Sequence, residues 1–207
     1  MAKVLVLGAG LMGPAIASDL LKHEIAERVV IADIDAGRVE EAVRRLGPDR
    51  CEGTVLDVWN RRALVDAMRG ADVVAGAYPV AAVAQVTEAA VEAGASLADL
   101  TGSAEGFDIF TYHDRAVRAG VTILPGCGVA PGLTNALVGQ GAARLDRPSE
   151  GVIYVGGLPL HPRPPLEYRL VFSIDTVIDE YVAPALVIRE GRVVEVPALD
   201  GLEPITF

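Results

Sequence analysis

The chain has 207 residues, 51% of them hydrophobic, which is enough to bury one sizeable core and a smaller second unit. Its 28 acidic residues against 18 basic ones give a formal net charge of −10, which disfavours nucleic acids and anionic membranes as partners. The two cysteines, Cys51 and Cys127, lie too far apart in sequence to form a metal-ligand motif, so we predict no metal site and a reducing, cytoplasmic location.

The first thirty residues predict a strand, a glycine-rich turn, a helix and a second strand that ends in an acid. Val4–Leu7 is an apolar run typical of a buried parallel strand, and Val29–Ala32 is a second such run, which leads into Asp33. The strand begins directly at the N-terminus, so we expect no signal peptide. In this context the glycine spacing is the dinucleotide-binding fingerprint. The glycines at G-x-G-x-x-G spacing are Gly8, Gly10 and Gly13.

The fingerprint also indicates which cofactor is bound. Gly10 leaves space for a pyrophosphate against the main chain, where the N–H groups of a helix that starts near Leu11 would bind it. Asp33 can accept hydrogen bonds from the adenosine ribose hydroxyls, and its charge would repel a 2′-phosphate. The next residues, Ile34 and Asp35, include no arginine. We therefore predict NAD as the cofactor in preference to NADP.

The pattern then alternates regularly between helix and strand up to residue 124. Asn60 is placed to cap one helix, and glycines 94 and 120 are placed to end two others. Six strands with intervening helices predict a doubly wound parallel Rossmann sheet over residues 1–126. No apolar run reaches the length of a membrane span. The helix after Asn60 is predicted from an apolar stripe of Ala63, Leu64, Ala67 and Met68. The further predicted elements are helices Ala36–Leu46, Val80–Ala93 and Phe107–Ala119, and strands Gly53–Leu56, Asp72–Ala77, Ser96–Leu100 and Val121–Leu124.

The texture changes after Pro125, where strands follow one another without crossover helices. We predict that residues 127–207 form part of an α+β mixed-sheet domain for substrate binding or dimerisation, and we expect a homodimer. A hairpin turned at Glu190-Gly191 is the clearest element. The predicted elements are helices Asn135–Leu145 and Thr176–Tyr181, and strands Val152–Val155, Glu167–Ile174, Ala185–Arg189 and Val193–Val196.

Ligands of an open parallel sheet bind beyond the carboxyl ends of its strands. Asp57 follows the third strand, where it could accept from an adenine amino group or instead cap the helix near Asn60. Tyr78 follows the fourth strand, where it could contact the nicotinamide ribose or pack as an ordinary aromatic. The predicted cofactor contacts are Gly8, Gly10, Leu11, Met12, Gly13, Asp33, Ile34, Asp57, Val58, Ala77, Tyr78 and Pro79.

Asp99 and Cys127 are the candidate catalytic residues, because both follow strands that end on the nicotinamide side of such a sheet. An acid there could orient or deprotonate a substrate amine or hydroxyl, since hydride leaves a carbon only as the heteroatom loses a proton. The alternatives are that Asp99 caps the following turn and that Cys127 lines the pocket as a small apolar group. The predicted substrate-binding residues are Tyr78, Asp99, Thr101, Cys127 and Arg169, the last as an anchor for a carboxylate.

The run from Gly94 to Asn135, which contains GCGVAPGLTN, resembles the saccharopine dehydrogenase-like family, as do VGGLP and IDEY further on. The likeness extends over essentially the whole chain. It implies nicotinamide-dependent oxidation at a carbon that bears the side-chain amine of lysine or of a lysine adduct, with Asp99 and Cys127 around this amino-acid substrate. Family members are longer, so the resemblance also implies that the second domain is incomplete at Phe207.

Together with Asp33, the resemblance favours an activity like that of lysine 6-dehydrogenase, in which NAD accepts the hydride and the imine is hydrolysed. Two alternatives stay open. The substrate could be saccharopine or a carboxylated polyamine, and the cofactor of such an enzyme could be NADP. The chain could also be a catalytically silent NAD-binding module.

Overall fold

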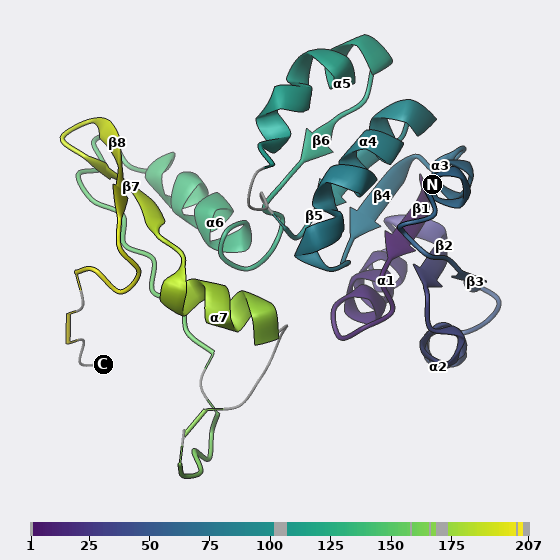
Figure 1. Cartoon of the computed structure of the whole chain (residues 1–207), viewed down its shortest axis with the longest axis horizontal. Helices are drawn as coiled ribbons and strands as arrows, with labels where there is room; N and C mark the ends of the chain where they lie inside the picture. The colour runs from purple at the N-terminus through teal and green to yellow at the C-terminus, as the bar shows by residue number, and fades with distance from the viewer. Residues whose placement is uncertain are drawn as a thin grey trace. The chain divides into compact units, whose positions relative to one another are not determined.

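Six strands form one sheet in a computed structural model of the chain (Figure 1). The structure describes residues 2–101, 107–157, 159–165, 167–168, 174–201 and 203–204. The strand order is β3-β2-β1-β4-β5-β6, and every neighbouring pair is parallel. The order reverses between β1 and β4, so the predicted doubly wound sheet is confirmed. The strands are β1 (Ala2–Leu7), β2 (Ala26–Asp33), β3 (Cys51–Val55), β4 (Val73–Gly76), β5 (Ser96–Asp99) and β6 (Ile123–Leu124).

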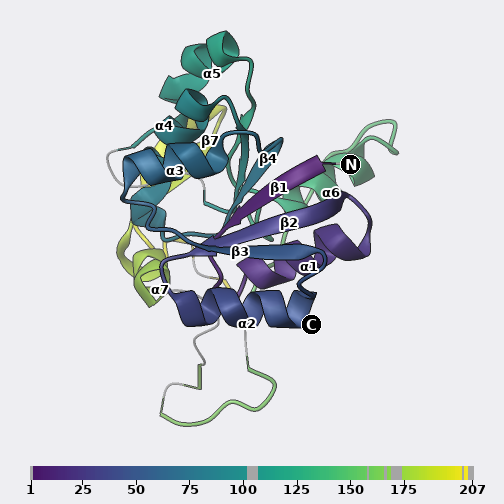
Figure 2. The same cartoon turned by 90° about the vertical axis from the view of Figure 1, so that its right-hand side faces the viewer.

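Helices cover both faces of this sheet, and strand β1 shows why its sequence is apolar throughout. Leu5 and Leu7 point into the core beneath α3 and α4, whereas Val4 and Val6 point into the core beneath α1 and α2. Figure 2 shows the two helical layers on opposite sides of β1, β2 and β3. The helices of these layers are α1 (Gly13–Lys22), α2 (Ala36–Leu46), α3 (Arg61–Met68), α4 (Val83–Ala93) and α5 (His113–Ala119). Helix α6 (Leu133–Ala142) follows later in the chain and buries none of its residues.

Local chemistry sets most helix ends. The Asn60 side chain accepts a hydrogen bond from the backbone N–H of Ala63 and begins α3, as the sequence predicts. Gly94 and Gly120 both adopt the left-handed conformation that ends α4 and α5. Two predicted helices begin with a 3₁₀ turn instead of an α-turn, namely η1 (Val80–Ala82) before α4 and η2 (Ile109–Tyr112) before α5.

The second compact unit spans residues 156–207, and the first spans residues 1–155. The second unit contains α7 (Ile174–Val182) and an antiparallel hairpin of β7 (Ala185–Arg189) and β8 (Arg192–Val196). Glu190 and Gly191 both have positive φ, which matches a type I′ turn and the predicted hairpin. The predicted domain boundary at residues 126 and 127 stays a prediction.

The sequence predicts two strands in this region that the described structure does not contain. The strand predicted at Val152–Val155 is wrong, because these residues are exposed and lie in no sheet of the described structure. A strand requires a neighbouring strand for its backbone hydrogen bonds, which an apolar run alone does not provide. Of the strand predicted at Glu167–Ile174, residues 169–173 lie outside the described residues, and Ile174 instead begins α7.

No helix within the described part of the chain is both long and apolar enough to cross a bilayer.

Candidate functional site

The glycine-rich turn after β1 contains glycines with two different tasks. A Cβ on Gly13 would lie 1.7 Å from the carbonyl oxygen of Gly8, and a Cβ on Gly8 would lie 2.2 Å from that of Ala77. Neither position can hold a side chain, because main-chain segments approach closely there. A Cβ on Gly10 would meet nothing within 4 Å. The space over Gly10 is therefore open to a ligand, as a bound pyrophosphate requires.

Helix α1 presents an uncapped N-terminus beside this space. The helix begins at Gly13, two residues later than predicted, and no side chain accepts a hydrogen bond from its first-turn N–H groups. Leu11 and Met12 are exposed in the turn that precedes it. Unpaired N–H groups and the positive end of the helix dipole suit an anionic phosphate group. The residues of the turn thus fit a dinucleotide.

Asp33 lies at the end of β2, where its carboxylate joins two neighbouring loops. One oxygen accepts from the N–H of Ala9 at 2.7 Å, and the other accepts from the N–H of Asp35 at 2.9 Å. The side chain is half-buried, whereas the adjacent Ile34 is 66% exposed. Each carboxylate oxygen can accept more than one hydrogen bond, so Asp33 retains acceptor capacity for ribose hydroxyls.

A pocket of about 310 Å³ opens between the glycine turn and helix α2, and it is lined by two arginines, Arg38 and Arg45, that were not predicted as site residues. Arg38 Nε lies 3.7 Å from Asp35 Oδ2, while the Asp35 side chain also caps α2. The Asp35 cap fixes the first turn of α2, to which Arg38 belongs, so an acid three residues before an arginine was the signal available in the sequence. The lining residues are Ala9, Gly10, Pro14, Asp35, Gly37, Arg38, Glu41, Ala42 and Arg45.

The loop after β3 lies next to Asp33, because the N–H of Leu56 donates to the Asp33 carbonyl at 2.9 Å. Asp57 follows, half-buried, and its carboxylate accepts from the N–H of Trp59 at 2.9 Å. Val58 packs against the core. Asp57 therefore shapes the loop while one of its oxygens stays available as an acceptor.

The strongest polar contacts at the strand ends surround Asp99, which is completely buried. One carboxylate oxygen accepts from Tyr78 Oη at 2.5 Å and from Thr101 Oγ1 at 2.7 Å. The other accepts from the N–H of Thr101 at 3.0 Å. A Cβ on Gly76 would lie 2.7 Å from the Tyr78 ring and 2.9 Å from this second oxygen, so only glycine fits beneath the pair.

Burial dominates the electrostatics of this pair. It raises the pKa of Asp99 above its ordinary value, although hydrogen bonds from Tyr78 and Thr101 act in the opposite direction. Burial and the Asp99 charge together raise the pKa of Tyr78, which keeps the phenol protonated. The pair can therefore hold a proton more readily than a surface carboxylate would.

The loop after β6 is tied to the same residues through its main chain. The N–H of Cys127 donates to the Asp99 carbonyl at 2.7 Å, and the N–H of Gly126 donates to the Thr101 carbonyl at 2.7 Å. Burial raises the pKa of the half-buried Cys127 thiol, which donates to the Leu124 carbonyl at 3.4 Å. The structure thus brings Tyr78, Asp99, Thr101 and Cys127 together at the ends of β4, β5 and β6.

Three further predicted site residues are Ala77, Pro79 and Arg169. Ala77 is half-buried and Pro79 exposed in the loop after β4. Arg169, the predicted carboxylate anchor, lies outside the described residues. Across the described ranges, no group of three or more His, Cys, Asp or Glu side chains is arranged to hold a metal ion.

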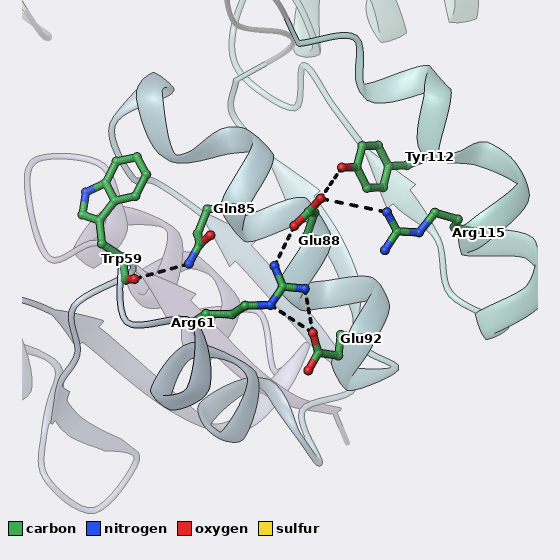
Figure 3. A network of polar contacts seen from close by, with 7 residues as sticks. All are labelled: Trp59, Arg61, Gln85, Glu88, Glu92, Tyr112 and Arg115. Carbon is green, nitrogen blue, oxygen red and sulfur yellow. Dashed lines mark hydrogen bonds and ion pairs between the residues drawn. The ribbon is translucent and has the colours of Figure 1, made fainter.

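An ion-pair network that joins α3, α4, η2 and α5 was not predicted (Figure 3). Arg61, the first residue of α3, contacts Glu88 at 2.6 Å and Glu92 at 2.7 Å on α4. Tyr112 of η2 donates to Glu88 at 2.6 Å, and Arg115 of α5 lies 4.0 Å from the same carboxylate. The glutamates recur at i and i+4 on one helix, which was the signal available in the sequence.

Comparisons with known proteins bear on the family and the fold of the chain. A family model described as the saccharopine dehydrogenase NADP binding domain matches residues 4–124, and one described as the saccharopine dehydrogenase C-terminal domain matches residues 128–207. An apo, histidine-tagged saccharopine dehydrogenase (L-Glu forming) from Saccharomyces cerevisiae is similar in structure, with a TM-score of 0.71 and 19% identity. The similarity covers 100% of this chain and 47% of the yeast protein.

A shikimate 5-dehydrogenase from Mycobacterium fortuitum is similar at a TM-score of 0.50 and 22% identity, over 68% of this chain and 49% of the other. At such identities the structures show the fold. The chain spans just under half the length of both solved proteins.

Proposed function

This chain belongs to the saccharopine dehydrogenase family of NAD(P)-dependent dehydrogenases, and we propose that it takes part in NAD-dependent oxidation at the amine-bearing carbon of lysine or a lysine-derived amino acid. The observation that carries the cofactor part is the open space over Gly10 between an uncapped helix and Asp33. The amino-acid substrate is supported by the family and by the acidic, hydrogen-bonding group around Asp99.

When bound, the nicotinamide ring would accept the hydride. The chain's own residues would handle the proton that the amine must lose at the same time. Thr101 is half-buried and its hydroxyl donates to Asp99 at 2.7 Å, so it can accept a proton from the substrate amine as it passes its own to the carboxylate. We assign Asp99 as the proton acceptor behind Thr101, and Cys127 as a wall of the substrate site.

The direct test follows NADH absorbance with lysine, saccharopine and related amines. We expect activity with at least one of them and a loss of about a hundredfold or more in kcat for Thr101→Val, a typical size for removal of general-base assistance. Cys127→Ala should mainly raise KM. Traces that stay flat with every amine would exclude the dehydrogenase activity for this length of chain.

The preference for NAD is a separate proposal, which rests on the charge of Asp33. Calorimetry should show tighter binding of NADH than of NADPH. Asp33→Asn should weaken NADH binding by about 1.5–3 kcal/mol, the range for a hydrogen bond to a charged group. Equal affinity of this variant and the unaltered chain for NADH would contradict the assignment.

NADP is the second candidate cofactor, because Arg38 and Arg45 line the pocket beside Gly10 and could bind a 2′-phosphate. Under this alternative, Arg38→Ala would weaken NADPH binding selectively and leave NADH binding unchanged. Under the NAD proposal, the same substitution would affect neither cofactor strongly.

We also propose a homodimer in the cytoplasm. Both cysteines, Cys51 and Cys127, are free, which suits a reducing compartment. Sedimentation equilibrium tests the dimer, and a monomer at every concentration would exclude it.

A further inference from the structure

We propose that Trp59 binds the adenine ring of the dinucleotide by stacking, and thereby contributes to the affinity for the adenosine half of the cofactor. The inference rests on the proposed cofactor binding. Trp59 lies in the loop after β3, and the N–H of Leu56, three residues earlier, donates to the carbonyl of Asp33. Asp33, whose carboxylate would bind the ribose, ends β2, and Trp59 follows the neighbouring strand β3.

The backbone of Trp59 is fixed from two sides. Its N–H donates to the Asp57 carboxylate at 2.9 Å, and its carbonyl accepts from Gln85 Nε2 of α4 at 3.4 Å. Figure 3 shows the indole directed away from the Gln85 contact and from the ion-pair network behind it. A fixed main chain with an outward-directed ring is preorganised, which lowers the entropic cost of binding a flat ligand.

The exposure of the ring supports a ligand contact. The Trp59 residue is 59% exposed, and Ile34, which follows Asp33 at the end of the neighbouring strand β2, is 66% exposed. A large aromatic and a branched aliphatic side chain at neighbouring strand ends offer apolar area to a planar base. Asp57 in the same loop retains an acceptor for an exocyclic amino group, which favours adenine over bases without one.

The chain contains a single tryptophan, so its fluorescence reports on this position alone. We expect adenosine monophosphate and ADP-ribose to quench the emission in a saturable way, and nicotinamide mononucleotide to leave it unchanged. Calorimetry with NADH runs in parallel. Heat of binding without any emission change would overturn the role of Trp59 alone. Absence of any binding heat would overturn both this inference and the proposed cofactor.

Substitutions separate stacking from mere bulk. Trp59→Ala should weaken NADH binding about tenfold or more, as loss of base–aromatic stacking does, whereas Trp59→Phe should retain most of the affinity. The matched control is Phe110→Ala, an exposed aromatic of η2 that follows β5, near the opposite edge of the sheet. Equal NADH affinity of the Trp59→Ala variant and the unaltered chain would refute the contact, and weakening by the control would show that the effect is unspecific.

Discussion

Gly10 and Gly13 belong to one sequence motif but differ in what surrounds them. The missing Cβ of Gly13 makes room for the chain's own Gly8 carbonyl, whereas the missing Cβ of Gly10 leaves open space. The position of each glycine in the fingerprint predicts that Gly10 faces the pyrophosphate and that Gly13 packs the helix on the sheet, but it does not predict how close these approaches are. The distinction depends on how closely α1 returns to β1, which is a property of the folded backbone.

Alanine substitutions test this difference. Gly10→Ala should leave the thermal stability unchanged and weaken NADH binding about tenfold to a hundredfold, because the methyl group holds the pyrophosphate off the backbone N–H groups. Gly13→Ala should destabilise the fold by about 3 kcal/mol or more through overpacking against a carbonyl. Melting curves and calorimetry measure the two effects.

The control is Gly139→Ala in α6, where a Cβ also meets nothing within 4 Å. It should affect neither NADH binding nor, beyond a small helix-propensity gain, stability. A fully stable Gly13→Ala variant would contradict the close approach.

The buried group around Asp99 yields a second prediction. Tyr78→Phe removes one of the three donors to this carboxylate and should cost about 1–3 kcal/mol at neutral pH, because a buried charge loses a hydrogen bond. Urea unfolding measures it. Tyr181→Phe, an exposed tyrosine of α7, serves as the control and should have no effect.

The pH dependence of this effect has a definite sign. The pKa of Asp99 in the folded chain is raised above its ordinary 3.8, so the contribution of this group to stability is largest below that pH and is lost as pH rises through the raised value. Removal of Tyr78 Oη raises the pKa further. The destabilisation by Tyr78→Phe should therefore grow from acid to neutral pH, and a constant difference would contradict an ionised Asp99.

Which residues lie at the carboxyl edge of the sheet could be predicted from the sequence, since parallel strands all end at one edge. The hydrogen-bond partners could not. Nothing in the spacing between Tyr78 and Asp99 shows that the phenol and the carboxylate meet, because their separation depends on the register of β4 and β5. Arg38 was missed for a similar reason, since its direction follows from the cap of α2.

At the scale of whole elements, α4 packs between α3 and α5. Glu88 of α4 contacts Arg61 of α3 and accepts a hydrogen bond from Tyr112 of η2 (Figure 3). The hydrogen bond from Tyr112, followed by that from Arg61, holds the pKa of Glu88 below its ordinary 4.5. The charge of this residue therefore stabilises the contact between helices above that pH.

Glu88→Gln should lower the unfolding free energy by less than about 1 kcal/mol near neutral pH, as expected for a solvent-screened network. The difference from the unaltered chain is present above pH 4.5 and is lost as pH falls through the lowered pKa of Glu88. Glu40→Gln on the exposed side of α2 is the control. A difference that persists in strong acid would contradict the ion pairs.

Elements were predicted best where several local features agree. Helix α2 has its predicted bounds, because an Asp35 cap, an apolar stripe and a terminal glycine all agree. The strand predicted at Val152–Val155 had only an apolar run in its favour, and pairing depends on a partner that no local pattern specifies. The 3₁₀ turns before α4 and α5 were missed because periodicity does not distinguish them from a first α-turn.

At the scale of the molecule, all the residues proposed to contact the cofactor belong to the first compact unit, residues 1–155. We expect a chain that ends at Val155 to unfold cooperatively and to bind NADH within about twofold of the longer chain, because a domain with its own core folds alone. Calorimetry and melting curves test this. A much weaker affinity would show that the second unit contributes to the cofactor site.

The fold of residues 2–124 followed from the sequence because alternation of strands and helices restricts topology strongly. The arrangement of residues 127–207 did not follow, since mixed sheets depend on contacts between segments distant in the chain. The hairpin was the exception, because its turn residues fix its register locally.

The contact between Gly8 and Ala77 has a consequence for how a coenzyme would enter. A Cβ on Gly8 would collide with the carbonyl oxygen of Ala77, so the turn after β1 and the loop after β4 pack closely against each other. We expect neither segment to move when a dinucleotide binds. We therefore expect a coenzyme to bind to a preformed site, with the conformational adjustment confined to the coenzyme.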